Sequence, residues 1–256
     1  MPASPVSADE IAALVAAEVT YDAGPPALGP FDLSLRAGEI VALVGASGCG
    51  KSTTLRLLAG LEAATKGVVR RAAGRGETSM VFQSPTLAPW LSAEDNVSVP
   101  MELAGVGRAV ARTHAAAALR RVGLGEALKA RPAQLSGGMA MRAALARALV
   151  TGPKVLLLDE PFAALDEITR RALADDLLEL WNTERPAIVF VTHNVEEAVY
   201  MAGRVVVMTL RPGRAAAEIA VAAPLPRPEN FRTTTLFREA AEAVSAELAL
   251  AMGGPR

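Results

Sequence analysis

The stretch Gly45-Ala46-Ser47-Gly48-Cys49-Gly50-Lys51-Ser52-Thr53 matches the phosphate-binding pattern G-x-x-x-x-G-K-[ST]. Residues 39–44 before it form a short β-branched apolar run, which predicts a buried parallel strand. Residues 54–59 after it have the apolar spacing of a helix that begins at Lys51. A glycine-rich turn in front of a helix aims backbone N–H groups at one point and adds the positive end of the helix, so such a turn binds anions.

The same stretch could be an ordinary glycine-rich turn with a helix behind it. The strand before it and the helix after it favour nucleotide binding instead. In that interpretation Lys51 neutralises the β- and γ-phosphates, and the hydroxyl of Ser52 ligates Mg²⁺. The rest of the chain must show which nucleotide chemistry follows.

The amino-acid composition indicates a chain that can bury a large aliphatic core. It has 256 residues, of which 51% are hydrophobic and only 4% aromatic. This length predicts one large domain, or a core with a subdomain. The formal net charge of −1 gives no broad electrostatic case for nucleic-acid binding, so nucleic acid is not an expected partner.

Cys49 is the single cysteine, which excludes an internal disulfide or a cysteine-rich metal site. Its place before the predicted helix could depress the pKa of the thiol. The favoured interpretation is a small residue that fits the loop. The start of the chain lacks a basic segment, and no apolar run approaches the roughly 18 residues of a membrane span. We therefore expect a cytoplasmic chain whose membrane role, if any, goes through a partner.

Strand and helix patterns alternate along most of the chain. Residues 1–15 are rich in Ala, Pro and Ser and are predicted to be frayed at their start. Predicted strands end near 18–21 and cover 31–35, 39–44, 67–71, 79–83, 154–160, 187–192 and 204–208. Predicted helices cover 51–59, 93–103, 109–121, a short piece near 125–128, 139–149, 167–180, 195–202 and about 230–250. This order predicts an α/β fold with a mostly parallel sheet covered on both faces.

Asp159 and Glu160 follow an apolar strand, at the edge of the sheet where ligands bind in such folds. Paired acids at a strand end are often only solvated. The upstream phosphate pattern favours a catalytic pair, in which Asp159 holds Mg²⁺ and Glu160 orients and deprotonates the attacking water.

The order of these motifs resembles that of ATP-binding-cassette (ABC) ATPases. The residues that carry the resemblance are Lys51 with its glycines, Gln83, Leu135-Ser136-Gly137-Gly138, Asp159-Glu160 and His193. The resemblance runs from about residue 21 to residue 208. It implies a P-loop NTPase core with a mostly parallel sheet, an antiparallel β subdomain and an inserted helical subdomain. The expected ABC domain covers 16–225, with the helical subdomain at about 90–135, and a helical extension follows at 226–256.

The resemblance also implies a site with ATP and Mg²⁺ as cofactors. The implied catalytic residues are Lys51, Gln83, Glu160 and His193. The implied nucleotide-binding residues are Tyr21, Gly45, Ala46, Ser47, Gly48, Cys49, Gly50, Lys51, Ser52, Thr53, Ser136, Gly137 and Gly138. The implied metal-binding residues are Ser52, Gln83 and Asp159.

Some of these roles have plainer alternatives. His193 could be a structural histidine, although the family places it at the γ-phosphate. Gln83 could be an ordinary loop residue, and Tyr21 a surface residue rather than the aromatic that stacks on adenine. His114 has no motif around it and is expected at the surface.

Ser136 and Gly137-Gly138 at a predicted helix start make a second anion site. The family uses such a pair of sites in a head-to-tail homodimer, which holds each ATP between Lys51 of one copy and Ser136 of the other. Residues 164–166 resemble the loop that crosses that interface. Isolated monomers are therefore expected to hydrolyse ATP poorly.

Four elements are similar to those of importer ATPases for nitrate, sulfonate, taurine and related compounds: the segments 81–91 and 191–198, Asn96-Val97, and Leu225-Pro226-Arg227-Pro228. That group implies docking on a permease, through Trp90 and its neighbours, and supply by a solute-binding protein. Trp90 could instead be a core aromatic. A soluble non-transport ABC ATPase is one alternative, although such proteins usually carry two cassettes or a long coiled-coil insert. A weakly hydrolysing scaffold is the other, because Ala140 and Ala163 depart from common family residues, as Met139 and Asn194 also do.

Overall fold

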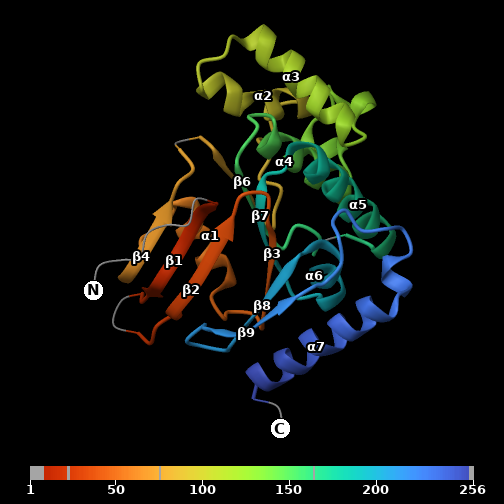
Figure 1. Ribbon diagram of the computed structural model, residues 1–256. Coiled ribbons are helices and arrows are strands. Elements are labelled where there is room, and N and C mark those ends of the chain that lie inside the picture. The colour runs from red at the N-terminus through yellow and green to blue at the C-terminus, as the bar shows by residue number, and fades with distance from the viewer. Residues whose placement is uncertain (1–8, 22–23, 75, 164, 254–256) are drawn as a thin grey trace.

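The computed structural model describes residues 9–21, 24–74, 76–163 and 165–253, and its centre is a six-stranded sheet (Figure 1). The strands lie in the order β5-β6-β7-β3-β8-β9. Their bounds are β3 (Ile40–Val44), β5 (Thr78–Val81), β6 (Val155–Asp159), β7 (Ala187–Thr192), β8 (Arg204–Met208) and β9 (Ala215–Ala220). All neighbours pair in parallel except β8 and β9, which are antiparallel. The predicted mostly parallel sheet is confirmed.

Both faces of this sheet are buried, which explains why its central strands are continuous apolar runs. On β3, Ala42 and Val44 face a core shared with helices on one side, while Val41 and Leu43 face the other side. The first side is covered by α4 (Gly137–Leu149), α5 (Glu167–Glu184), α6 (Val195–Met201) and α7 (Thr235–Ala251). The second side is covered by α1 (Lys51–Ala59) and by a second sheet.

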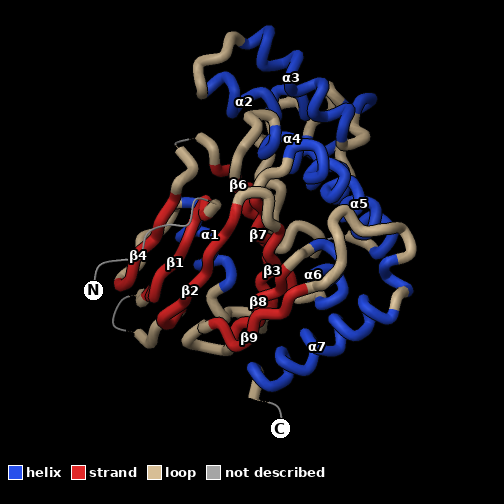
Figure 2. The backbone as a smooth tube through the Cα atoms, in the orientation of Figure 1, coloured by secondary structure: helices blue, strands red, loops and turns tan. Residues whose placement is uncertain are grey.

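The second sheet has three antiparallel strands in the order β2-β1-β4. They are β1 (Glu10–Val19), β2 (Leu28–Arg36) and β4 (Lys66–Arg71). Figure 2 shows these strands beside the main sheet, with the helices other than α1 gathered above and on the opposite side. This sheet is the antiparallel β subdomain that the sequence resemblance implies.

A helical subdomain stands at the end of the main sheet, at the top of Figure 1. It contains α2 (Ala93–Leu103) and α3 (Arg108–Arg121), and it packs on α4. Single-turn helices at Gly125–Ala127 and Pro132–Gln134 connect α3 to α4. Its small core joins alanine, valine and leucine side chains of these helices, among them Val97, Leu119 and Ala146. The subdomain is thus inserted between β5 and β6, as predicted.

The last segment wraps back onto the core. After the turn Phe231–Thr233, α7 contacts α6, β8 and β9 and buries Phe237 and Val244. Arg227, only 7% exposed, donates to the carbonyl oxygens of Val199, Tyr200 and Ala202 at the end of α6. A cation at a helix C-terminus satisfies its free carbonyls. The described part of the segment 226–256 therefore packs on α6, β8 and β9, and its standing as a separate extension remains a prediction.

Two strands differ from the sequence predictions. β1 begins at Glu10, inside the segment 1–15 and before the predicted domain start at residue 16. Its alternation is interrupted by register shifts near Ala12 and Ala17, so no period of two was visible. β9 was not predicted at all, because its alanine-rich sequence has low strand propensity and the strand exists by pairing with β8. Among the described residues, no helix is long and apolar enough to span a membrane.

Candidate functional site

Residues 45–53, hereafter the phosphate loop, connect the end of β3 to the start of α1. Gly50 caps α1 with a left-handed backbone, φ 100°, which favours glycine. Gly45 has no room for a side chain, because a Cβ there would lie 2.7 Å from Cys49 Sγ and 3.1 Å from the carbonyl oxygen of Met208. The glycine pattern thus produces a tight turn in front of a helix N-terminus, as the sequence predicted.

The side chain of Lys51 lies inside this turn. Its Nζ donates to the carbonyl oxygens of Gly45 and Ala46, both at 2.8 Å, and the residue is 5% exposed. Both partners are neutral carbonyls, so they hold the buried ammonium without cancelling its charge as a carboxylate would. Its full positive charge is therefore available to an anion that enters the loop.

Ser52 and Asp159 meet beside the loop. The Ser52 hydroxyl donates to Asp159 Oδ1 at 3.0 Å, although the residues are far apart in sequence. Burial raises the pKa of the Asp159 carboxyl, and the hydrogen bond from Ser52 partly offsets this rise. A hydroxyl and a carboxylate are the oxygen ligands that Mg²⁺ prefers when phosphates and water complete its shell. The pair therefore fits the predicted metal position.

Glu160 lies next to two other predicted residues. Gln83 Nε2 donates to Glu160 Oε2 at 3.3 Å, and His193 Nδ1 lies 3.5 Å from the same oxygen. Glu160 itself has a positive φ of 46°, and its N–H donates to Val191 at 3.1 Å. The three residues follow β5, β6 and β7, which are neighbours in the sheet. Their strand ends therefore open at the same edge, as in other parallel sheets.

Tyr21 lies at the rim of the site. Its hydroxyl is 3.4 Å from Thr53 Oγ1, and 48% of the residue is exposed. An aromatic face in that position is open to a flat ligand. The structure thus places Tyr21 beside the phosphate loop, and its adenine role stays a prediction.

The second predicted anion segment, Ser136 to Gly138, begins α4. Ser136 is exposed, and its hydroxyl accepts a hydrogen bond from the N–H of Met139 at 3.2 Å. A Cβ on Gly138 would approach Thr169 Cγ2 at 2.8 Å, so Gly138 packs closely on the start of α5. In the predicted interface loop, Ala164 lies outside the described residues, while Asp166 caps α5 through the N–H of Thr169.

The segment 84–91 after Gln83 is held by two residues to which the sequence pattern gave no contact role. Arg147 of α4 donates to the carbonyl oxygens of Pro85 and Thr86 at 2.9 and 2.8 Å. The Asn96 side chain donates to the carbonyl oxygens of Ala88 and Leu91. No spacing rule marks them, because each is an isolated polar residue on a helix. They fix the segment while Trp90 points outward with 73% exposure, so a core role for Trp90 is wrong.

Cys49 is fully buried, and burial raises the pKa of its thiol. The suggestion of a depressed pKa is therefore wrong, because loss of hydration outweighs the charge of Lys51. The thiol instead fills the space beside Gly45. The favoured interpretation of a small residue that fits the loop agrees with this position.

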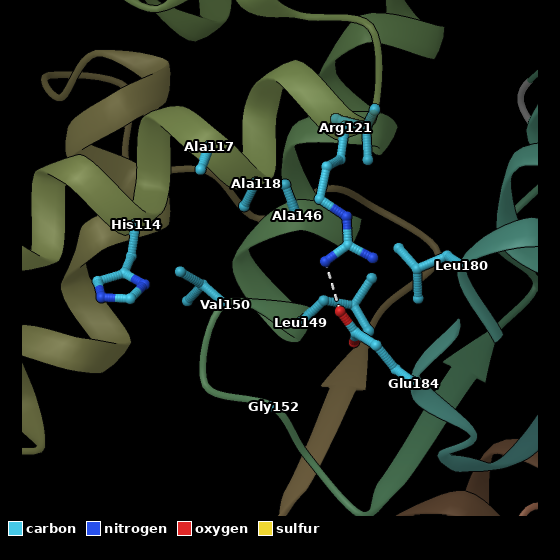
Figure 3. A pocket seen from close by; sticks show the side chains of 11 residues that line it. His114, Ala117, Ala118, Arg121, Ala146, Leu149, Val150, Gly152, Leu180 and Glu184 are labelled. Atoms are coloured by element: carbon cyan, nitrogen blue, oxygen red, sulfur yellow. Dashed lines mark hydrogen bonds and ion pairs between the residues drawn. The ribbon is translucent and has the colours of Figure 1, made fainter. Parts of the chain in front are cut away.

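A separate hollow of about 250 Å³ lies between α3, α4 and the end of α5 (Figure 3). Alanine, valine and leucine side chains line most of it, and Arg121 pairs with Glu184 across it. His114 sits exposed at its edge, as predicted. None of the motif residues lines this hollow.

The chain matches the family model described as ABC transporter over residues 28–163. An aliphatic sulfonates import ATP-binding protein SsuB 2 of Pseudomonas syringae pv. tomato is 44% identical over 223 residues, which are 87% of this chain and 92% of that protein. A second such protein of the same organism, SsuB 1, is 50% identical over 207 residues, 81% of this chain and 73% of that protein. These matches show the family.

The solved structures agree. A dimeric structure of the bacterial ABC transporter cassette MJ0796 has a TM-score of 0.75 and 29% identity, covering 83% of this chain and all of that chain. A post-hydrolysis dimer of the same cassette, bound to ADP and Pi, has a TM-score of 0.74. The chain belongs to the ABC transporter family and is an ABC ATPase, which binds ATP. Its predicted likeness to the sulfonate importer group is confirmed.

Proposed function

We propose that this chain is the ATP-hydrolysing subunit of a membrane importer for a small solute of the nitrate, sulfonate or taurine type. The observation that carries this proposal is the meeting of Glu160, Gln83 and His193 at the edge of the sheet that also holds Lys51. Such an arrangement suits water attack on a terminal phosphate. The importer part is supported by the relatives named for aliphatic sulfonates import.

In this proposal the phosphate loop binds the nucleotide. Backbone N–H groups of residues 45–53 receive the phosphates at the positive end of α1, and Lys51 neutralises their charge. Tyr21 stacks on the adenine. Ser52, Asp159 and Gln83 would hold Mg²⁺, which when bound neutralises charge that develops on the phosphate oxygens.

Glu160 acts on the attacking water. Its carboxylate, presented by the positive φ turn after β6, accepts the proton of the water. Gln83 and His193 both face Glu160 Oε2, and each can hydrogen-bond the water or the γ-phosphate as well. The protein thereby supplies position and charge, which are the main sources of catalysis in phosphoryl transfer.

A second copy completes the site. We assign Ser136, Gly137 and Gly138 to the γ-phosphate of the partner copy, in a homodimer that closes on ATP and reopens after hydrolysis. The exposed start of α4 supports this, because Ser136 and Gly137 are open to a ligand from outside the chain. The dimeric assembly of the similar cassette MJ0796 supports it as well.

The segment 84–91 transmits this motion to a permease. Trp90 is the exposed aromatic anchor of the docking surface, and Arg147 connects that segment to α4, the helix that Ser136 begins. The chain is then a cytoplasmic protein, peripheral to the plasma membrane through the permease. A binding protein delivers the solute and touches the ATPase only indirectly.

The substitution Glu160→Gln tests the catalytic part. We expect MgATP binding to persist, while hydrolysis falls about 100-fold or more because the amide cannot accept the proton. The variant should accumulate as a closed dimer with MgATP in size-exclusion chromatography. Glu242→Gln on the exposed face of α7 is the matched control. Wild-type turnover in Glu160→Gln would remove Glu160 as the base.

A non-transport ABC ATPase or a weakly hydrolysing scaffold is the alternative. Co-purification with a permease separates an importer subunit from a soluble factor. Steady-state ATPase assays separate an enzyme from a scaffold. Ala140 and Ala163 are the departures on which the scaffold alternative rests.

A further inference from the structure

A line of polar contacts connects the start of α5 with the turn that carries His193. Arg170, in the first turns of α5, donates from Nη2 to the carbonyl oxygen of Leu165 at 3.0 Å. Its Nε lies 3.3 Å from Glu197 Oε1, which belongs to α6. One guanidinium therefore contacts both the residue before the α5 cap and the first turn of α6.

Glu197 continues this line toward the catalytic edge. Its other oxygen, Oε2, accepts a hydrogen bond from the hydroxyl of Thr192. The same hydroxyl accepts the backbone N–H of Asn194 at 3.0 Å. Thr192 and Asn194 are the two neighbours of His193, so the contacts fix the backbone on both sides of the histidine.

The contacts lie in a sheltered place. The side chain of Glu197 is 11% exposed and that of Arg170 is 24% exposed. A carboxylate so little exposed is costly without a cation and hydrogen bonds beside it. Arg170 also lies 3.5 Å from Glu167, but that carboxylate is 55% exposed and is paired with Arg171 as well. Arg170 is thus the cation that Glu197 depends on.

We propose that Arg170 and Glu197 are positioning residues for ATP hydrolysis, which hold His193 beside Glu160 and link its position to Leu165. This inference rests on the proposed role of Glu160 and His193. Leu165 precedes Asp166, the cap of α5, in the loop assigned to the dimer interface. A shift of that loop would therefore move the carbonyl that Arg170 holds, and with it the histidine turn.

The adjacent arginine offers a matched control. Arg171 pairs only with the exposed Glu167 among the contacts described, and its side chain is 56% exposed. Arg171→Met removes the same charge from the same helix without touching Glu197. Arg170→Met, Glu197→Gln and their double variant remove the line of contacts, while Arg170→Lys keeps a positive charge.

Steady-state hydrolysis is the first measurement. We expect kcat to fall about 10- to 100-fold in Arg170→Met and in Glu197→Gln, because a small displacement of a catalytic group has effects of this size. KM for MgATP should change less than about twofold, since the phosphate loop is untouched. The double variant should be no slower than either single variant, and Arg170→Lys should recover part of the loss.

Imidazole NMR is the second measurement and does not need turnover. The chain has two histidines, so ¹⁵N-labelled histidine gives two ring spectra. In Arg170→Met the signals of His193 should shift, while those of exposed His114 should stay in place as the internal reference. Arg171→Met should leave both spectra unchanged.

The outcomes separate the two proposals. If wild type hydrolyses ATP and Arg170→Met keeps its kcat within about twofold, the positioning role is wrong. An unchanged His193 spectrum in Arg170→Met and Glu197→Gln also overturns the positioning role, whether or not the chain is active. The same holds if the losses of kcat in the two single variants multiply in the double variant. If the wild-type chain does not hydrolyse ATP but the His193 signals still shift in Arg170→Met, the positioning contacts stand and the proposed function is overturned.

Discussion

The molecule contains two glycine-bearing helix starts that look alike in sequence and differ in their surroundings. The phosphate loop before α1 encloses its lysine: Lys51 is buried and Gly45 is packed against Cys49, while Ser47 and Gly48 stay exposed. The start of α4 is open, and a Cβ added to Gly137 would meet nothing within 4 Å. The first holds its lysine inside one chain. The second leaves Ser136 and Gly137 exposed, although the Ser136 hydroxyl accepts the N–H of Met139, and this exposure suits a ligand held by another copy.

The strongest way to break this comparison is to damage the enclosed site. Lys51→Met removes the charge at the phosphates, so hydrolysis should fall about 100- to 1000-fold, and ATP binding should weaken with it. Binding of a fluorescent ATP analogue and phosphate release measure the two effects. Unchanged affinity and turnover would contradict the role of the loop.

At the open start of α4 we expect turnover to fall while ATP binding is kept. Ser136→Arg places a bulky cation at the exposed cap, so turnover should fall about 10- to 100-fold because the second copy can no longer close on the nucleotide. ATP binding to the isolated chain should stay within about twofold of wild type. Loss of binding in Ser136→Arg would mean that the residue serves its own chain. Glu242→Gln remains the control.

A matched pair of glycine substitutions compares the effect on stability. Gly45→Ala forces a methyl against Cys49 and Met208 and should lower the free energy of unfolding by about 1–3 kcal/mol. Gly137→Ala lies in open space at a helix start and should change it by less than about 1 kcal/mol. Urea denaturation measures both. Equal losses would show that the two surroundings do not differ as described.

Thiol labelling compares the two helix starts through the alkylation rates of a cysteine in each, and we expect the smallest effects here. Because burial raises the pKa of Cys49, less thiolate is present at a given pH than in a free cysteine, so alkylation should be slow and should accelerate as pH rises. MgATP should slow it further in single copies. In a Cys49→Ala background, Ser136→Cys should label quickly and be protected only when ATP and a second copy are both present. Protection of that thiol at dilutions where the chain is monomeric would contradict the two-copy site.

The sequence predicted most of the main sheet because β3, β6 and β7 are short apolar runs buried on both faces. It failed where strands are built from alanine: β1 is interrupted by bulges, and β9 depends on pairing with β8. Such strands owe their existence to neighbours that a local pattern does not contain.

The candidate site divides in the same way. Motif spacing predicted Lys51, Ser52 and Asp159, which the structure brings together, and their roles stay predictions. The approach of Gln83 and His193 to Glu160 depends on the order of β5, β6 and β7, which the sequence alone does not contain. Arg147 and Arg170 carry no motif, because a single charged residue on a helix looks like any solvated one. Glu197 lies in the segment 191–198 that carries the family resemblance, but that resemblance gave it no role.

A mixing experiment tests the shared site most directly. Lys51→Met and Ser136→Arg chains should each be nearly inactive alone. A mixed dimer contains one intact site, made from the phosphate loop of the Ser136→Arg copy and the start of α4 from the Lys51→Met copy. We therefore predict that mixing the two restores ATP hydrolysis to a substantial fraction of the wild-type rate. If the mixture stays as inactive as its two components, the site is not shared between copies.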